Sequence, residues 1–489
     1  MILKKHTVSP FAIALIFLGI WLALGMAINT SLYADNFEQF DWAHGMEIGY
    51  WKHPPITTWI LIAFQSLAGV HVFNTYIVCF VCWAVTLYFY WRLARLLLPS
   101  HLADFALLLL SSTYMLTWRA QLFNHNVTLV MMTTITTWFF FRLMSKPQAK
   151  LWEWACLGLL SALAILSKYQ SMVGLFGLLI SFSLLYKKNN RPNLLRLAFA
   201  FCVFLVVLSP HLYWFYKHYH MISSFSLNAV SVSRSWLERC HSLLGFFTQQ
   251  LRFFLVPLII SMILWAAHHL RERGRSNEAV LLVRRPDRVW LLSLVVFPIA
   301  FVVLMNQLLG MTLANHWGFG ILLFVPMLLA WYLGRVIGPE KFSFLGVYVL
   351  FQLINLGAYY GMKDHAKHSV MTHQYDEFYP SQQMADAVKE TWALQTNCPM
   401  KVISGPTFEA GIVSLYSGQY PAVVEFGDLR KSPWIKEEDL ALHGYVVISH
   451  DIQQLQNLGE VHTLPDSVKQ RYLPLKDFYW VNIIPKHPC

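Results

Sequence analysis

The sequence predicts a polytopic α-helical membrane protein that ends in a small soluble α/β domain. Of its 489 residues, 56% are hydrophobic and only 13% are charged, a balance typical of chains that cross a bilayer several times. Long apolar runs follow one another as far as residue 361, and beyond it the chain becomes polar with apolar runs of strand length. This composition excludes an ordinary soluble globular protein.

The first apolar segment, 11–28, follows Lys4 and Lys5 and resembles the core of a secretory signal peptide. No small-residue cleavage pattern comes after it, and further apolar runs continue for hundreds of residues. We therefore expect an uncleaved first membrane helix.

About eleven segments have the length and apolarity of a membrane-spanning helix, for which roughly 17–25 residues suffice. They are 11–30, 75–97, 102–118, 123–143, 151–167, 170–186, 194–216, 247–270, 289–309, 318–337 and 342–361. The segment 56–70 is apolar but shorter, and we expect it to form an interfacial helix that leads into the second span.

The loops between these segments differ in charge. One alternate set of loops holds 19 of the 26 Lys and Arg residues of segment 1–361, and the positive-inside rule assigns this set to the cytoplasm. The N-terminus is then cytoplasmic, whereas loops 31–55 and 217–246, the turn 315–317 and everything after residue 361 face the other side. In a Gram-negative cell that other side would be the periplasm, and the chain would be a multi-pass protein of the inner membrane with a periplasmic C-terminal domain.

The net charge of +11 does not indicate a nucleic-acid partner. Residues 1–361 carry a net charge of +15 and residues 362–489 a net charge of −4. The positive excess lies in short loops beside membrane lipids, and a nucleic-acid site would need it on one soluble face.

Residues 362–489 predict an α/β domain, because segment 381–394 has helical spacing of apolar residues among strand-length apolar runs. The expected strands are 400–405, 421–426 and 445–450. Cys398 and Cys489 lie in this part, and their spacing alone leaves open whether they are paired.

Segment 33–55 is the most charged part of the predicted membrane region. Its ionisable side chains are Asp35, Glu38, Asp41, His44, Glu47, Lys52 and His53. On a helix, Asp35 and Glu38 would share a face, and two neighbouring carboxylates at a partly dry boundary can form a general base or a metal ligand. The alternative is a solvated acidic loop.

Four motifs in order point to a family. They are Asp35 with Gly49-Tyr50, His53-Pro54-Pro55 and Trp59; the span 158–180 with Lys168-Tyr169; the segment 208–225; and Asn315-His316-Trp317. This pattern resembles bacterial relatives of the protein O-mannosyltransferases, in the superfamily that also contains the lipid A aminoarabinose transferases and has the GT-C type glycosyltransferase fold.

The resemblance implies a membrane glycosyltransferase whose donor is a sugar on a polyprenyl (or dolichyl) phosphate. It places Asp35 at the reaction centre, with Glu38 as the second catalytic carboxylate. The acceptor would be lipid A, another envelope glycan or a protein at the periplasmic face. The chain departs from the family at Asn36, where an acidic residue is usual, and at Asn124-His125-Asn126, where many relatives carry Thr-Pro-Asp.

The leaving lipid phosphate requires cationic and polar groups nearby. The residues expected to bind the phosphate or the sugar are Lys52, His53, Arg119, Asn124, Asn126, Lys168, Tyr169, His211 and His316. For Lys168 the alternative is a lysine that snorkels to the interface. No cofactor is certain; a divalent metal held by Glu38 and His53 remains open, because imidazole and carboxylate suit Zn²⁺ or Mn²⁺.

Two other functions compete with the transferase. A transporter or flippase of a lipid-linked sugar would also carry ionisable residues in its membrane part, although such proteins usually show repeats and mid-bilayer charges. An inactive relative that only binds the lipid-linked sugar is the third reading, suggested by Asn36 and Asn126.

Overall fold

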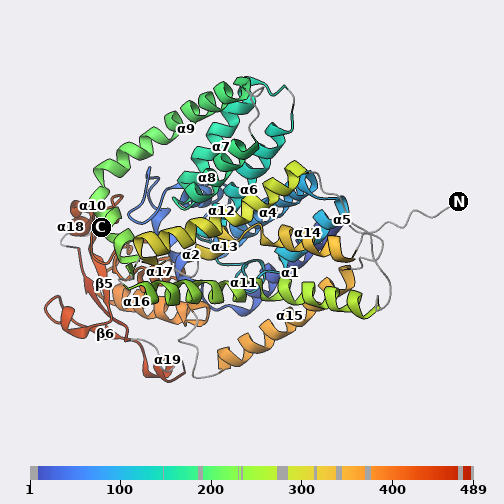
Figure 1. Cartoon of the computed structure of the whole chain (residues 1–489). Helices are drawn as coiled ribbons and strands as arrows, with labels where there is room; N and C mark the ends of the chain where they lie inside the picture. The colour runs from blue at the N-terminus through green and yellow to red at the C-terminus, as the bar shows by residue number, and fades with distance from the viewer. Residues whose placement is uncertain are drawn as a thin grey trace.

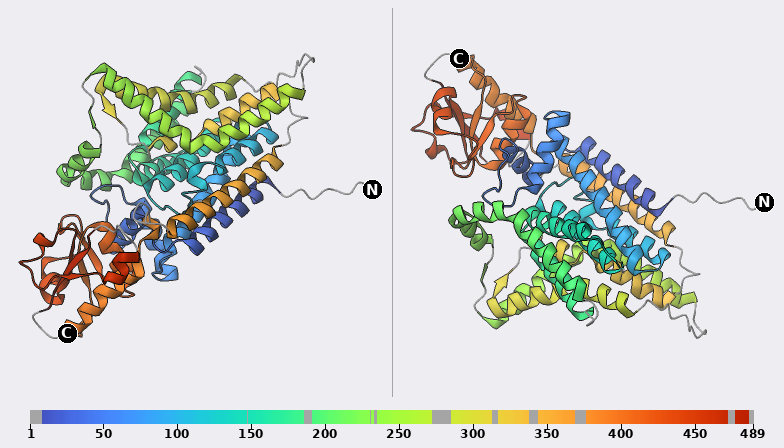
Figure 2. Two further views of the ribbon diagram at one scale, coloured as in Figure 1. Left: turned by 90° about the horizontal axis from the view of Figure 1, so that it is seen from below. Right: turned by 90° about the horizontal axis from the view of Figure 1, so that it is seen from above.

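The structure is a computed structural model of the chain, shown in Figure 1. It describes residues 9–146, 148–185, 191–229, 231–232, 235–271, 285–312, 317–337, 344–368, 376–471 and 477–485. Long helices form a bundle, and a small sheet with its own helices caps one end of that bundle (Figure 2).

Each of the eleven segments predicted to span the membrane contains a helix. These helices are α1 (Pro10–Ile28), α4 (Asn74–Leu97), α5 (Ser100–Ser111), α6 (His125–Met144), α7 (Leu151–Ser167), α8 (Ser171–Leu185), α9 (Arg191–Lys217), α11 (Trp236–Arg271), α12 (Arg285–Leu309), α14 (Val325–Ile337) and α15 (Leu345–His368). Within the described residues, seven helices are long and apolar enough to cross a bilayer alone, namely α1, α4, α6, α9, α11, α12 and α15. The prediction of a multi-pass helical protein is confirmed.

The remaining elements of the bundle are short. They are α3 (Ile56–Ala68), η1 (Tyr114–Leu116), α10 (Tyr219–Ala229), α13 (Gly318–Ile321), and the antiparallel pair β1 (Ser231–Val232) and β2 (Met311–Thr312). The short helix α3 was expected between residues 56 and 70. It connects the charged first loop to α4.

The span predicted at 102–118 is shorter than expected, because α5 ends at Ser111. The hydroxyls of Ser111, Ser112 and Thr113 donate to backbone carbonyls three residues earlier, at 2.9, 2.8 and 2.7 Å. Such local bonds compete with helix propagation. The chain therefore leaves the helix at this level and continues through η1 toward α6.

The C-terminal part is an α/β unit built on a five-stranded sheet of order β4-β3-β5-β7-β6. Its elements are η5 (Asp376–Phe378), α16 (Ser381–Gln395), β3 (Val402–Gly405), α17 (Thr407–Tyr416), β4 (Ala422–Glu425), α18 (Glu437–His443), β5 (Tyr445–Ser449), η6 (Ile452–Gln454), β6 (His462–Thr463), α19 (Asp466–Arg471) and β7 (Tyr479–Ile483). The three predicted strands are the parallel strands β3, β4 and β5. The antiparallel strands β6 and β7 were not predicted.

Two sequence expectations about this part meet the structure only in part. The expected boundary between residues 361 and 362 falls inside α15, which continues to His368. Cys398 is disulfide-bonded, while Cys489 lies outside the described residues.

The charged first loop begins with a helix, α2 (Ala34–Trp42), that lies between the bundle and the C-terminal part (Figure 2). Phe37 packs edge-on against Phe408 of α17, with ring centroids 5.5 Å apart. A Cβ atom at Gly411 would lie 2.8 Å from Phe37 Cβ, so glycine is required for α17 to approach this closely. The loop is therefore held by the C-terminal part as well as by the membrane helices.

Candidate active site

Asp35 and Glu38 lie one turn apart on α2, in different surroundings. Asp35 is exposed in the first turn, where the positive end of the helix dipole stabilises an anion. Its Oδ2 accepts a hydrogen bond of 2.7 Å from Asn124 Nδ2. Glu38 is buried and forms an ion pair with Lys52. The two carboxylates therefore differ in accessibility, and Asp35 is the one open to a substrate.

The Glu38–Lys52 pair is shaped by burial and by neighbouring charges. Burial raises the pKa of Glu38; Lys52 opposes this shift, and Asp35 adds to it. Burial disfavours the charged form of Lys52, but the carboxylates of Glu38 and Glu425 outweigh it and raise the pKa of Lys52. Lys52 therefore stays an ammonium at neutral pH.

Lys168 is buried in the turn between α7 and α8. Its Nζ donates a hydrogen bond of 2.5 Å to Asn126 Oδ1 and lies 5.6 Å from the ring centroid of Trp317. Burial lowers the pKa of Lys168 to about 7, with the charge of Asp35 opposing that shift. The side chain points into the protein near Asp35 and does not snorkel outward.

Asn124 and Asn126 hold an anion and a cation side by side. Asn124 is the N-cap of α6, and its Oδ1 accepts from the backbone N–H of Asn126 at 2.9 Å. Its amide group donates to Asp35, while Asn126 accepts from Lys168. A neutral donor thus faces the Asp35 carboxylate, and a neutral acceptor faces the Lys168 ammonium.

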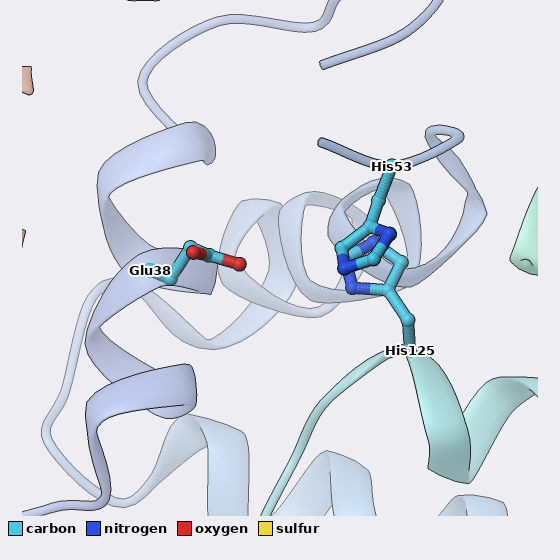
Figure 3. A group of neighbouring side chains, drawn as sticks. All are labelled: Glu38, His53 and His125. Atoms are coloured by element: carbon cyan, nitrogen blue, oxygen red, sulfur yellow. The ribbon is translucent and has the colours of Figure 1, made fainter. Parts of the chain in front are cut away.

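Glu38, His53 and His125 converge on one point, as Figure 3 shows. One ligand atom from each of them lies within 4.8 Å of the others, and the two imidazole centroids are 4.1 Å apart. His125 Nε2 is buried without a hydrogen-bond partner among the described residues. This orphaned nitrogen makes a carboxylate–imidazole–imidazole metal set chemically reasonable.

Two other predicted residues support the loop from α7–α8 and α9. Tyr169 OH and His211 Nε2 are 3.0 Å apart, and His211 Nδ1 lies 2.8 Å from the carbonyl oxygen of Ile48. His211 therefore contacts the backbone of the charged loop, and Tyr169 joins His211 to the Lys168 turn.

Arg119 and His316 are the last two predicted residues. Arg119 packs over Tyr33, 4.9 Å from the ring centroid, and its Nε donates to Tyr114 OH at 3.3 Å. His316 lies outside the described residues.

The structure adds residues that the sequence argument missed. Glu425, at the end of β4, accepts hydrogen bonds from Trp42 and Trp51 of the charged loop. Asp41 is 0% exposed, and neither of its carboxylate oxygens has a hydrogen-bond partner among the described residues. The position of Asp41 in the charged segment could have indicated its involvement. Nothing in the sequence around Glu425 indicates that it contacts this segment.

Comparison with known structures identifies the fold. The crystal structure of ArnT from Cupriavidus metallidurans bound to undecaprenyl phosphate superposes with a TM-score of 0.61, at 14% identity, over 98% of this chain and 98% of ArnT. This chain has the GT-C fold. The apo structure of the same ArnT matches with a TM-score of 0.51 over 96% of this chain and 98% of ArnT, at 14% identity.

Sequence comparisons agree with this GT-C assignment. The family described as "Dolichyl-phosphate-mannose-protein mannosyltransferase" matches residues 52–214. The lipopolysaccharide core galacturonosyltransferase RgtA of Rhizobium johnstonii (strain DSM 114642 / LMG 32736 / 3841) is 24% identical over 313 residues, which cover 63% of this chain and 60% of RgtA. The chain thus aligns with about three fifths of this curated relative. The resemblance to GT-C glycosyltransferases is confirmed, and Asp35 and Glu38 precede the segment matched by the family.

Proposed function

We propose that this GT-C protein transfers a sugar from a polyprenyl-phosphate carrier to an acceptor at the extracytoplasmic face of the membrane, with Asp35 at the reaction centre. The observation that carries the proposal is the Asn124–Asn126 turn, which holds the Asp35 carboxylate and the Lys168 ammonium beside each other. An inverting transfer requires an anion beside the acceptor and a cation beside the leaving phosphate. Both groups are present here.

An apolar cavity supports a polyprenyl donor. Its volume is about 590 Å³, and it lies among α7, α8 and α9. Its lining includes Leu157, Ile165, Met172, Phe176 and Phe204. Ile165 and Met172 flank the turn that carries Lys168, so an isoprenoid chain in this cavity would bring its phosphate to the end where Lys168 lies.

In the proposed reaction, an acceptor oxygen attacks the anomeric carbon of the sugar. The new carbon–oxygen bond forms while the bond from that carbon to the phosphate oxygen breaks, and the phosphate leaves with the electron pair. Lys52 and Lys168 stabilise the charge that grows on the phosphate. A hydroxyl acceptor gives its proton to Asp35; an acceptor that is already an ionised phosphate has none to give, and Asp35 then orients it.

The relatives support the class of donor and acceptor. ArnT was crystallised with undecaprenyl phosphate, and RgtA is named for transfer of galacturonosyl to the lipopolysaccharide core. We assign this chain an acceptor of the bacterial envelope, such as lipid A, another glycan or a protein. The charge asymmetry of the loops supports an inner-membrane location with a cytoplasmic N-terminus and a periplasmic C-terminal part.

We further propose that Glu38, His53 and His125 bind a divalent transition metal when Lys52 gives up its contact with Glu38. Two imidazoles and a carboxylate favour Zn²⁺ or Mn²⁺ over Mg²⁺. When bound, the metal would add positive charge beside the leaving phosphate.

The test is transfer by the purified full chain in detergent. The protein is incubated with a radiolabelled polyprenyl-phosphate sugar and crude envelope acceptor, and labelled product is separated from donor. Label in the acceptor supports the transferase. Transport needs a sealed membrane, so a flippase gives no labelled product in detergent. Donor binding without labelled product would therefore reject the transferase in favour of a transporter or an inactive relative.

A further inference from the structure

Glu425 connects the C-terminal sheet to the charged loop. It is the last residue of β4 and is 0% exposed. Its Oε1 accepts a hydrogen bond of 2.5 Å from Trp42 Nε1, and its Oε2 accepts one of 2.7 Å from Trp51 Nε1. One carboxylate from a distant part of the sequence therefore binds two tryptophans of the proposed catalytic loop.

The two tryptophans lie beside the reacting groups. Trp42 ends the helix that carries Asp35 and Glu38, and its ring is 5.6 Å from the His125 ring. Trp51 directly precedes Lys52, whose Nζ lies 4.6 Å from the Trp51 ring centroid. Fixing both indoles therefore fixes the end of α2, which carries Glu38, and the backbone next to Lys52.

The loop packs further against the two ends of β4. Tyr420 and Phe426 are the two non-glycine residues with positive φ in the described part of the chain, at 50° and 54°. His44 stacks on Tyr420 with centroids 4.1 Å apart, and Trp51 meets Phe426 edge-on at 6.5 Å. Such strained conformations persist where the surroundings over-determine them, and they cluster at functional sites.

Electrostatic interactions also connect Glu425 to the Glu38–Lys52 pair. Glu425 is among the groups that raise the pKa of Lys52. Burial and the charge of Glu38 raise the pKa of Glu425 to about 7, while Lys52 and the two indole hydrogen bonds oppose this shift. The Glu425 carboxylate is thus part of the electrostatic surroundings of the Glu38–Lys52 pair.

We propose that Glu425 is a positioning residue through which the C-terminal part completes the active site, by holding Trp42 and Trp51 and so placing Lys52 and His53 at the lipid phosphate. Its role in the reaction rests on the proposed function. Its role in ordering the loop does not.

The experiment compares the full chain with Glu425→Gln, which keeps the shape but places an amide N–H against one indole N–H. Hydrogen exchange measured by mass spectrometry should show faster exchange in peptides that cover residues 42–53 and unchanged exchange in α4 and α6. The Kd for undecaprenyl phosphate should rise by about tenfold or more, because a hydrogen bond to a charged group is lost. Transfer should show the same loss in kcat/KM.

Two further variants separate positioning from general destabilisation. Asp428→Asn changes a carboxylate in the same segment whose partner is the exposed Arg430. Its hydrogen exchange, its Kd for undecaprenyl phosphate and its kcat/KM should all match the wild type. Trp51→Phe removes one donor and keeps an aromatic ring at this position. If Glu425 acts through Trp51, the double variant should bind undecaprenyl phosphate no more weakly than Glu425→Gln alone.

The proposal is overturned if Glu425→Gln shows the hydrogen exchange and the Kd of the wild type. It is also overturned if the increases in Kd caused by Glu425→Gln and Trp51→Phe multiply in the double variant, because the two residues would then act independently. The two proposals can fail separately. If the wild-type protein makes no transfer product, but Glu425→Gln still shows faster hydrogen exchange in residues 42–53, the proposed function is rejected and the positioning role stands.

Discussion

Asn124 Nδ2 donates a hydrogen bond of 2.7 Å to Asp35 Oδ2, which joins the N-cap of α6 to the first turn of α2. Because Asn124 is neutral, the bond orients the carboxylate without neutralising it. The adjacent Asn36 is fully buried and donates to Thr75 Oγ1 and to the carbonyl oxygen of Gln121, both at 3.0 Å. Asn36 thus fixes α2 in place, and Asp35 remains the exposed carboxylate of this turn.

Replacing Asn124 with Asp should lower kcat by about tenfold or more, because the lost bond involves a charged group. The aspartate keeps the N-cap acceptor for the Asn126 N–H, so the helix start is preserved, but it no longer donates to Asp35 and repels it. Steady-state transfer kinetics and a thermal melt in detergent check this. A wild-type rate in Asn124→Asp would contradict the orienting role.

Lys168 should produce an alkaline limb in the pH profile of transfer. Burial lowers its pKa to about 7, so the ammonium is present below that pH and is lost as the pH rises through it. If the ammonium stabilises the leaving phosphate, kcat/KM falls over this range. Lys168→Arg stays charged and should move the limb to higher pH, even if its rate is lower. If the alkaline limb of the Lys168→Arg profile lies at the same pH as that of the wild type, the limb belongs to another group.

The Glu38–His53–His125 set should bind about one Zn²⁺ or Co²⁺ per chain after removal of metal with a chelator. His125→Ala and Glu38→Gln should weaken that binding by about 10-fold or more, whereas Lys52→Met should tighten it, because Lys52 competes for Glu38. The exposed His71 provides the control, as His71→Ala. Calorimetry and the visible spectrum of Co²⁺ measure the binding. Equal affinity in wild type and His125→Ala would place any bound metal elsewhere.

Asp41 should make the protein less stable as the pH rises. Its carboxyl is fully buried, and burial together with the charges of Glu425 and Glu38 raises its pKa well above the usual value. The folded state therefore binds a proton that the unfolded state has released, and unfolding becomes easier with each step of pH between the two pKa values. Melting temperatures of Asp41→Asn in detergent should depend less on pH than those of the wild type. Parallel curves would contradict the account.

Local features of the sequence predicted the helices and much of the site. Apolar runs gave helices in all eleven predicted spans. The sequence predicted Lys168 in a turn at the end of a span, where the structure has it, and the structure adds that its side chain is buried. Asp35 was singled out by its family motif. These features depend on residues close together in the chain.

The features that were missed depend on distant contacts. The hydrogen bonds from Trp42 and Trp51 to Glu425 join residues 383 and 374 positions apart, and no local pattern distinguishes Glu425 from any glutamate that ends a strand. The same holds for β7, which pairs antiparallel with β5. The break at Ser111 arises from hydroxyl–backbone bonds that hydropathy does not register.

The central claim is that the Asp35 carboxylate acts at the reaction centre. Its most direct test compares Asp35→Asn with Glu47→Gln, a change of the same kind in the same loop, in the detergent transfer assay. Asp35→Asn should lower the transfer rate by about 10²–10⁴-fold, while it still binds undecaprenyl phosphate and keeps its melting temperature; Glu47→Gln should transfer normally. Transfer at the wild-type rate by Asp35→Asn would contradict the assignment.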